Sequence, residues 1–472
     1  MTTTINPDYL VIGAGAMGLA FVDTLITDTN ATVAIVDRYA RPGGHWTIAY
    51  PHVTLHQPSA FYGVNSQEFP AEKNIDKFGG NKGMSELATG DGVRSYFSRI
   101  MQQTFLPSGR VEYYPSHEYV GEGEFRPLIT KDKAIRVGPD TRIVDATFMK
   151  VEVPAMRPPP YEVAEGVHLT TPNGLVSLTR PYGGYTVVGA GKTGIDACLW
   201  LLSRGIDAKD ISWIMPRDSW YLNRSNVQPS WSPANNPQSF GAEAEAIMNA
   251  SDLEDLFYRL EASGNMMRID KNIWPTMYKC ATVSTLELQE IQKVGNIIRQ
   301  GRIARIAPDE VILEGGNKYT PVPDTLYIDC SADGLARLKP VPVFDGKRIT
   351  LQSVRFCQQV FSAAFIAHVE ATYGDDEKAK NALCTVVPHP DETQDFLSRT
   401  LVTYSNALKM YSQPKTRAWS SQARLDMSNS RMPSDPAAAA EAAAAKPAVM
   451  QAVCDKLSRL IDVESAKAAS KA

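Results

Sequence analysis

The sequence has no excess of basic residues and no long apolar run. Its 48 Lys and Arg are outnumbered by 52 Asp and Glu, which gives a formal net charge of −4 at pH 7. A nucleic-acid partner is therefore not expected, because binding to phosphate backbones needs clustered cations in excess. No apolar run approaches the roughly 18–20 residues that cross a bilayer, and the start, MTTTINPDYLVIG, lacks the basic and then apolar order of a signal peptide. We expect a cytoplasmic protein without membrane contact.

Cysteines are few and show no paired motif. The six are widely spaced, with no CxxC, which argues against a disulfide framework, a zinc ribbon and a dithiol redox centre. His52 and His56 have the spacing of two ligands on a helix, but Pro51 and the residues between them favour extended chain. There the two rings would lie about 13 Å apart, too far for one ion. No metal site is expected.

What remains is the composition of an ordinary globular protein, with 43% apolar and 21% charged residues. A chain of 472 residues is too long for one simple core, so two domains, which can be interleaved, are expected. Two glycine-rich loops of the same pattern, about 175 residues apart, indicate how these domains are built.

The first loop follows YLVI (9–12), an apolar run typical of a buried parallel strand. Its glycines have G-x-G-x-x-G spacing and are Gly13, Gly15 and Gly18. In such a loop the first glycine permits a tight turn, the second lets the backbone approach a pyrophosphate, and the third lets helix and strand pack closely. The helix predicted over 19–28 then directs its N-terminus at the negative charge. The next strand, TVAIVD, ends in Asp37, where a carboxylate can accept hydrogen bonds from ribose hydroxyls.

These features predict a dinucleotide site. Its contacts are expected from Gly13, Gly15, Ala16, Met17, Gly18, Asp37 and Arg38.

The chain continues as RPGGHW (41–46) and YPHVTLHQPSAFYGVNS (50–66). Here it resembles the flavin-containing monooxygenase-like group of FAD/NAD(P)H oxidoreductases with two dinucleotide-binding domains. In that group a G-G-x-W turn and a Y-P…P-S-x-x-Y segment line the flavin side of FAD. The resemblance implies that the first site holds FAD, while core packing is the alternative for Trp46 and Tyr62. The implied flavin-side contacts are Gly44, His45, Trp46, His56, Gln57 and Ser59.

The second loop repeats the pattern inside the chain. YTVV (185–188) is a predicted strand, and the helix IDACLWLLSRG after the loop is expected to stop at Gly205. The next strand, ISWIM (211–215), ends in Pro216-Arg217 and not in an acid, with Arg224 seven residues later. An arginine there makes charge-assisted bonds with a 2′-phosphate, which a carboxylate would repel, so NADPH is favoured over NADH.

Lys192, inside this loop, either adds charge near the phosphates or is a solvated lysine at a helix start. The expected contacts of the second site are Gly189, Gly191, Lys192, Thr193, Gly194, Arg217 and Arg224. By resemblance, the chain returns to FAD near DTLYIDCSADG (324–334), and the start of a later helix faces the flavin. These regions add Gly334, Gln358 and Gln359 to the expected contacts.

The predicted fold class is α/β, with two Rossmann-like dinucleotide-binding domains, the NADPH domain inserted in the FAD domain, and a C-terminal helical extension. The predicted division is 1–165 for the first part of the FAD domain, 166–328 for the NAD(P)H domain, 329–430 for the second FAD part and 431–472 for the Ala-rich extension. This extension is expected to hold two helices. The second carries an apolar stripe, formed by Val449, Val453, Leu457, Leu460 and Ile461, that docks on the same chain or on a partner in a homo-oligomer. The last ten residues, 463–472, are expected to be disordered.

The resemblance implies an NADPH-dependent FAD monooxygenase acting on a small organic substrate and O₂. In that family, hydride reduces the flavin, O₂ adds at C4a, and the resulting (hydro)peroxide oxygenates the substrate. Two departures stand out: the F-x-G-x-x-x-H fingerprint is missing, and His56 stands where Baeyer–Villiger members place an acid. His56 is therefore either a catalytic hydrogen-bonding group or an ordinary polar residue. The alternatives are an NADPH-dependent flavin reductase or dehydrogenase without oxygenation, and a non-catalytic FAD/NADPH-binding redox sensor.

Overall fold

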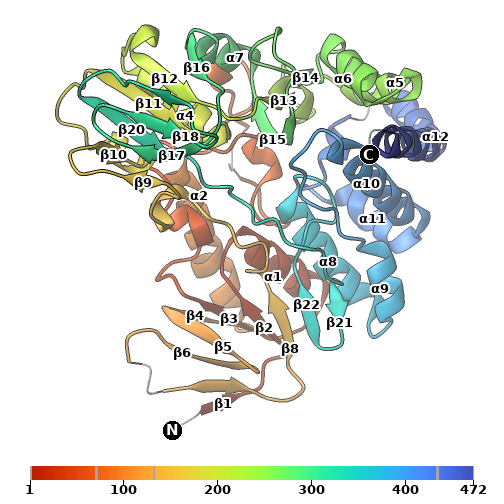
Figure 1. Cartoon of the computed structure of the whole chain (residues 1–472). Coiled ribbons are helices and arrows are strands. Elements are labelled where there is room, and N and C mark those ends of the chain that lie inside the picture. Colours follow the sequence, from red (N-terminus) through yellow and green to blue (C-terminus); the bar gives the residue numbers. More distant parts are fainter. Residues whose placement is uncertain (1–2, 70–72, 131–132, 432–434, 471–472) are drawn as a thin grey trace.

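The computed structural model describes residues 3–69, 73–130, 133–431 and 435–470. Two parallel sheets dominate it, and we call them the first and the second sheet (Figure 1). The first sheet has the order β21-β22-β8-β2-β3-β4, and all its strands except β21 run parallel to their neighbours. Its strands are β2 (Tyr9–Ile12), β3 (Val33–Asp37), β4 (Val111–Pro115), β8 (Arg142–Asp145), β21 (Phe344–Asp345) and β22 (Arg348–Thr350).

One face of the first sheet carries helices. α1 (Ala16–Asp28), α2 (Gly90–Ile100) and α8 (Gln359–Tyr373) share a core with residues such as Val11, Ile35 and Ile349 of its strands. The other face packs on a small sheet of order β1-β7-β6-β5 through Leu10 and Val36. The small sheet consists of β1 (Thr3–Ile5), β5 (His117–Gly121), β6 (Glu124–Pro127) and β7 (Ile135–Val137).

The second sheet is parallel throughout, with the order β10-β20-β11-β12-β16. α4 (Lys192–Ser203) and α7 (Thr285–Ile291) share a core with one of its faces. A second small sheet, β19-β18-β17-β9, covers the other. The strands of these two sheets are β9 (Glu162–Val163), β10 (His168–Thr170), β11 (Gly184–Val188), β12 (Ile211–Ile214), β16 (Asn296–Ile298), β17 (Ile303–Ile306), β18 (Val311–Leu313), β19 (Lys318–Tyr319) and β20 (Thr325–Asp329).

The second sheet is inserted in the first. The chain leaves the first sheet after β8 and returns to it at β21 and β22, and the whole second sheet forms in between. The α/β class, with two Rossmann-like units of which one interrupts the other, is confirmed. Where each domain begins and ends, at 165, 328 and 430, stays a prediction.

A third core joins a small sheet to the C-terminal helices. Trp220, Phe257, Phe396 and Leu457 meet in it, one from each of four elements. This core as a whole is built from seven elements: β13 (Ser219–Asn223), β14 (Met266–Met267), β15 (Met277–Val283), α5 (Ser239–Asn249), α6 (Leu253–Ala262), α10 (Asp395–Ser412) and α12 (Pro436–Ala469). The remaining helices are α3 (Pro172–Leu175), α9 (Glu377–Leu383) and α11 (Pro414–Gln422). Among the described residues, none of the helices combines the length and apolar character that a membrane crossing needs.

The C-terminal extension differs from its prediction. It forms one helix, α12, which runs through Pro447 and continues to Ala469, so the expected two helices and the expected disorder of 463–472 are wrong for the described residues. Part of the predicted stripe is buried on α5 and α10 of the same chain: Val453, Leu457 and Leu460 are at most 1% exposed. Val449, at 43%, is exposed. Proline has no backbone N–H to donate, so Pro447 removes one hydrogen bond from the helix. The helix continues past it because its second half packs against α5 and α10.

Candidate functional site

The first loop (residues 13–18) joins β2 to α1 as predicted. Gly13 has φ 104°, a left-handed backbone that favours glycine, and its N–H donates to the Val36 carbonyl at 2.8 Å. A Cβ on Gly18 would lie 2.1 Å from the Gly13 carbonyl oxygen, so only glycine fits there. Gly15 is different, because its backbone is extended and a Cβ would meet only the Gly44 Cα, at 3.6 Å. Protein packing therefore requires Gly13 and Gly18 but not Gly15.

Asp37 lies at the end of β3 beside this loop. It is 5% exposed and accepts hydrogen bonds from the backbone N–H groups of Ala14 and Tyr39, the latter at 2.7 Å. Burial raises the pKa of its carboxyl group. Arg38 is exposed, while Met17 is buried in the core and offers only its backbone at the start of α1.

The segment implied to line a flavin lies against the first loop. Gly44, at φ 58°, places its backbone next to Gly15, and a Cβ there would lie 3.0 Å from the Gly15 Cα. Trp46 donates from Nε1 to the Tyr62 hydroxyl at 2.7 Å and packs in the first core, as the core-packing alternative proposed. Ser59 is fully buried; its hydroxyl donates to the Glu86 carbonyl and accepts from the Ala88 N–H. Ser59 therefore has no free face, which corrects its predicted cofactor contact.

The second loop (residues 189–194) has the same construction as the first. Gly189 has φ 117°, and its N–H donates to the Ile214 carbonyl at 3.0 Å. A Cβ on Gly194 would lie 2.2 Å from the Gly189 carbonyl oxygen, which also accepts a hydrogen bond from Trp213 Nε1. Gly191 again stands apart: its backbone is extended, and a Cβ there meets no protein atom within 4 Å.

The start of α4 faces residues 50–56 of the first unit. The Tyr50 hydroxyl donates to Asp196 at 2.6 Å, and Lys192 forms an ion pair with the same carboxylate. The His52 ring lies between Tyr50 and Trp200, with ring centres 4.7 and 5.5 Å away. Lys192, 18% exposed, is therefore paired and not a solvated lysine. The second unit and residues 50–56 of the first unit meet at this ion pair.

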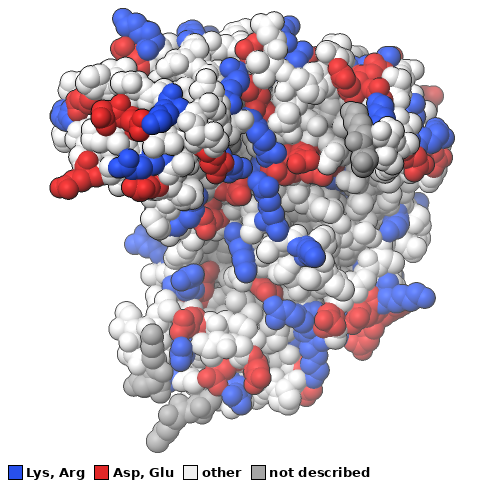
Figure 2. All heavy atoms as spheres, viewed as in Figure 1, with Lys and Arg blue, Asp and Glu red and all other residues white. Residues whose placement is uncertain are grey.

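The two arginines expected at the 2′-phosphate occupy different environments. Arg217 follows β12, keeps 29% of its side chain exposed and donates to both carboxylate oxygens of Asp391 at 2.8 Å. Asp391 also pairs with Arg337 at 3.0 Å and lies 3.7 Å from the Lys279 ammonium group. Figure 2 shows Lys and Arg side chains gathered along the middle of one face, over the region between the two parallel sheets.

Arg224 is fully buried. It donates to the carbonyls of His56 at 3.0 Å and Thr282 at 3.1 Å, and pairs with Glu287 at 2.7 Å. Although burial raises the pKa of the Glu287 carboxyl, the charges of Arg224 and Lys192 bring it below its usual value. The Arg224 guanidinium has no surface left for a phosphate, which corrects its predicted contact.

The returning segment brings α8 to the same end of the first unit. His368 of α8 binds Asp28, the last residue of α1, at 2.7 Å, and the two helices pack against each other. Gln358, immediately before α8, has a buried side-chain oxygen without a partner, and Gln359 donates to the Ser353 hydroxyl at 3.3 Å. Gly334, at φ 77°, accepts from the Glu152 N–H where the chain crosses between the units.

Comparison with known proteins found no matching family model. The mycobacterial proteins named "Uncharacterized protein Rv2000", of Mycobacterium tuberculosis, and "Uncharacterized protein Mb2023", of Mycobacterium bovis, are each 49% identical to this chain over 426 residues. The match covers 90% of this chain and 78% of theirs. The chain belongs to their family.

Several solved structures show a weaker likeness. A flavin-containing monooxygenase from Stenotrophomonas maltophilia is 15% identical, with 79% of this chain and 98% of that one covered and a TM-score of 0.44. The OTEMO complex with FAD and NADP is 14% identical, with 79% of this chain and 86% of that one covered and a TM-score of 0.48. The bacillithiol disulfide reductase of Staphylococcus aureus is 11% identical, with 79% of this chain and 98% of that one covered and a TM-score of 0.41. Likeness at this level assigns no activity to the chain, and its fold is established by its own strand order.

His56 belongs to residues 50–56, which meet the start of α4 at the junction of the two units, and its ring is neutral. Burial, helped by the charges of Lys192 and Arg224, lowers its pKa to about 3, and its Nδ1 is buried without a partner. His45 and His52 are also half-buried, and burial lowers the pKa of each to about 4. Gln57, which follows His56, is half-buried, and so are Ala16 in the first loop and Thr193 in the second.

We expect the free energy of unfolding to fall as the pH drops from about 6.5 to about 4. The unfolded chain takes up a proton at His56 below its ordinary pKa near 6.5, whereas the folded chain does so only near pH 3, so acid favours the unfolded state throughout this window. His56→Gln should reduce this loss by about 1–3 kcal/mol. Urea unfolding of both proteins at pH 7, 6, 5 and 4 checks this, and parallel pH profiles would contradict it.

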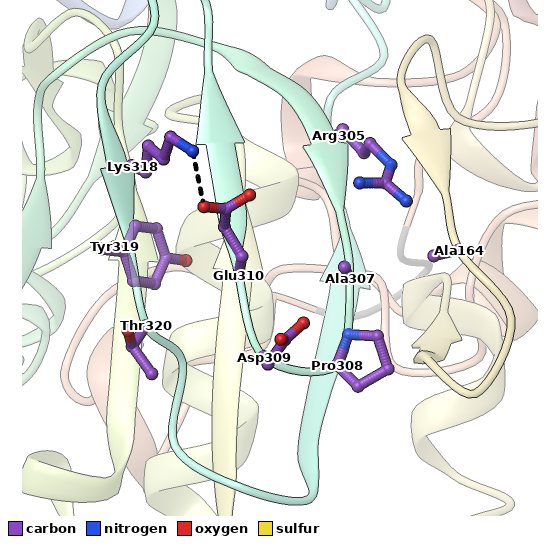
Figure 3. A pocket seen from close by; sticks show the side chains of 9 residues that line it. All are labelled: Ala164, Arg305, Ala307, Pro308, Asp309, Glu310, Lys318, Tyr319 and Thr320. Atoms are coloured by element: carbon purple, nitrogen blue, oxygen red, sulfur yellow. Dashed lines mark hydrogen bonds and ion pairs between the residues drawn. The ribbon is translucent and has the colours of Figure 1, made fainter.

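A surface hollow of about 670 Å³ lies apart from these residues, on the sheet of β17, β18 and β19. Figure 3 shows the Lys318–Glu310 ion pair, at 2.8 Å, which joins β19 to the turn before β18. None of its nine lining residues belongs to either glycine loop, so it is not part of the candidate site.

Proposed function

We propose that the protein is an FAD-dependent oxidoreductase that is reduced by NADPH and acts as a monooxygenase on a small organic substrate. One observation carries the proposal: Gly15 and Gly191, the middle glycines of the two loops, are glycines that packing does not require. Packing does not explain why these two positions are glycine. A pyrophosphate that has to approach the backbone closely at each loop does explain it. Two such loops on units that meet at Tyr50 and Asp196 suit two dinucleotides in one chain.

The residues at both loops fit these cofactors. For FAD, the start of α1 would receive the pyrophosphate, Asp37 the ribose, and the unpartnered Gln358 oxygen the flavin side. For NADPH, the start of α4 would receive the pyrophosphate and Arg217 the 2′-phosphate. When bound, FAD would supply the redox chemistry, namely acceptance of hydride from a nicotinamide and reactivity toward O₂.

The chain's own part in this reaction is to bind, orient and exclude water. Lys192 and Asp196 fix the position of Tyr50 through the ion pair and hydrogen bond described above. His56 is neutral at pH 7, so it can donate or accept one hydrogen bond but does not deliver a charge. No group of this junction has to act as a nucleophile.

Arg217→Ala should weaken NADPH binding about tenfold and leave NADH binding unchanged, since only NADPH carries the 2′-phosphate. Equilibrium binding of both cofactors to both proteins measures this. Asp391→Asn is the matched variant, because it frees Arg217 from its carboxylate partner and should strengthen NADPH binding. An equal loss of NADPH and NADH in Arg217→Ala would remove the 2′-phosphate role.

The proposal is tested on purified protein. It should be yellow with bound FAD, and anaerobic NADPH should bleach the flavin absorbance. When oxygen and an amine, thioether or ketone are added, one oxygen atom should appear in the product. Release of all the reducing equivalents as H₂O₂ with every substrate offered would make it a reductase instead, and a colourless protein that takes up no FAD would end the proposal.

A further inference from the structure

The structure divides the cysteines into two classes. Cys280 and Cys357, 77 residues apart, form a disulfide with a Cα–Cα distance of 6.3 Å, and both are half-buried. The other four, Cys198, Cys330, Cys384 and Cys454, are free and buried. Burial raises the pKa of each of these four thiols, which makes them poor nucleophiles. The sequence argument against disulfides is corrected for this pair, because it considered only cysteines that are close in sequence.

The disulfide joins the two units. Cys280 lies on β15, which pairs with β13 next to the second sheet, and Cys357 lies in the segment between β22 of the first sheet and α8. A non-covalent contact runs beside it: the Tyr278 and Phe356 rings stack with centres 5.9 Å apart. The guanidinium of Arg399 lies 3.8 Å from the Phe356 ring centre and 4.8 Å from that of Tyr278. Breaking the disulfide would therefore loosen the segment before α8 without separating the units.

Two features of Cys357 favour opening of the bond. Its backbone has φ 58°, a left-handed conformation that a residue with a side chain adopts only when its surroundings hold it there. α8 begins two residues later, and the positive end of a helix stabilises a nearby thiolate. A stabilised thiolate is the better leaving group in thiol–disulfide exchange.

We propose that Cys280–Cys357 is a thiol–disulfide exchange site for dithiol reductants, and that its oxidised form holds the segment 351–358 against β15. A thiolate of the dithiol attacks the Cys280 sulfur, the Cys280–Cys357 bond breaks, and Cys357 leaves as a thiolate that takes a proton. The second thiol of the reductant then attacks the mixed disulfide and releases Cys280. Two electrons pass from the dithiol, which becomes a disulfide, to the cystine, which becomes two thiols. This inference does not depend on the proposed function.

The first test titrates the folded full-length protein with dithiothreitol at pH 8 and labels thiols with iodoacetamide. Mass spectrometry should find no labelled cysteine before reduction and only Cys280 and Cys357 after it, and oxidised dithiothreitol should reverse the change. Amide exchange in 277–283 and 351–358 should rise about tenfold on reduction. Thiols that are free in the air-oxidised protein, a bond that opens only in denaturant, or unchanged amide exchange would each overturn the proposal.

Single variants give the second test. Cys280→Ser and Cys357→Ser should each capture one glutathione from oxidised glutathione, and the double variant none. Cys357 in the first variant should react with iodoacetamide several-fold faster at pH 7 than Cys280 in the second, because of its place before α8. Cys454→Ser, a matched change at a buried free cysteine, should behave as the unchanged protein. Failure of both single variants to capture glutathione would overturn the exchange role.

Discussion

Gly191→Ala should weaken NADPH binding about 100-fold, a loss of about 2.7 kcal/mol, and leave the apoprotein as stable as before. The backbone of Gly191 is extended and a Cβ there meets no protein atom within 4 Å, so alanine fits the folded chain. Alanine also restricts the unfolded chain, and stability should therefore stay equal or rise by less than about 1 kcal/mol. The methyl group would occupy the space through which a pyrophosphate approaches the start of α4.

Calorimetric binding of NADPH and thermal unfolding of the apoprotein measure the two effects separately. Gly194→Ala is the control within the same loop, because its Cβ would collide with the Gly189 carbonyl oxygen and should destabilise the fold itself. Gly15→Ala is the equivalent change in the first loop and should impair FAD binding in the same selective way. Unchanged NADPH affinity in Gly191→Ala would remove the central reason for placing a dinucleotide at the second loop.

The parts of the fold that were predictable depend on short-range patterns. The run YLVI predicts β2 and the spacing of Gly13, Gly15 and Gly18 predicts the turn into α1, because each is determined by residues that are close in sequence. The same holds for β3, which ends at Asp37 as expected. The insertion of one unit into the other was also predictable, but from the repeat of the loop pattern and the family resemblance.

Properties that depend on distant neighbours were not predictable. Cys280 and Cys357 carry no local signal, since only the packing of β15 against the segment before α8 brings them together. Ser59 follows the family pattern, yet its hydroxyl forms hydrogen bonds with the backbone of Glu86 and Ala88, at least 27 residues away. Pro447 indicates a helix end locally, and contacts with α5 and α10 overrule it.

Arg217 and Arg224 show the same limit for the site. Seven residues apart after one strand, they are equivalent candidates in the sequence, but one is paired at the surface and the other is enclosed. Only the structure reveals that Glu287, far along the chain, lies within 2.7 Å of Arg224. Charge and spacing alone therefore could not separate an arginine whose side chain stays partly exposed from one that is enclosed where the units meet.

Arg224→Ala should lower the free energy of unfolding by about 3–5 kcal/mol, since it leaves the Glu287 carboxylate buried without its cation and three acceptors unsatisfied. Arg224→Met with Glu287→Leu removes both charges together and should recover part of this loss. Arg217→Ala is the matched control, and with its side chain 29% exposed it should cost less than about 1 kcal/mol. Urea unfolding at pH 7 compares the four proteins. Arg224→Ala could instead unfold at the same urea concentration as the unchanged protein and lose its preference for NADPH over NADH. The enclosed role assigned to Arg224 would then be wrong, and its predicted contact with the 2′-phosphate would be supported.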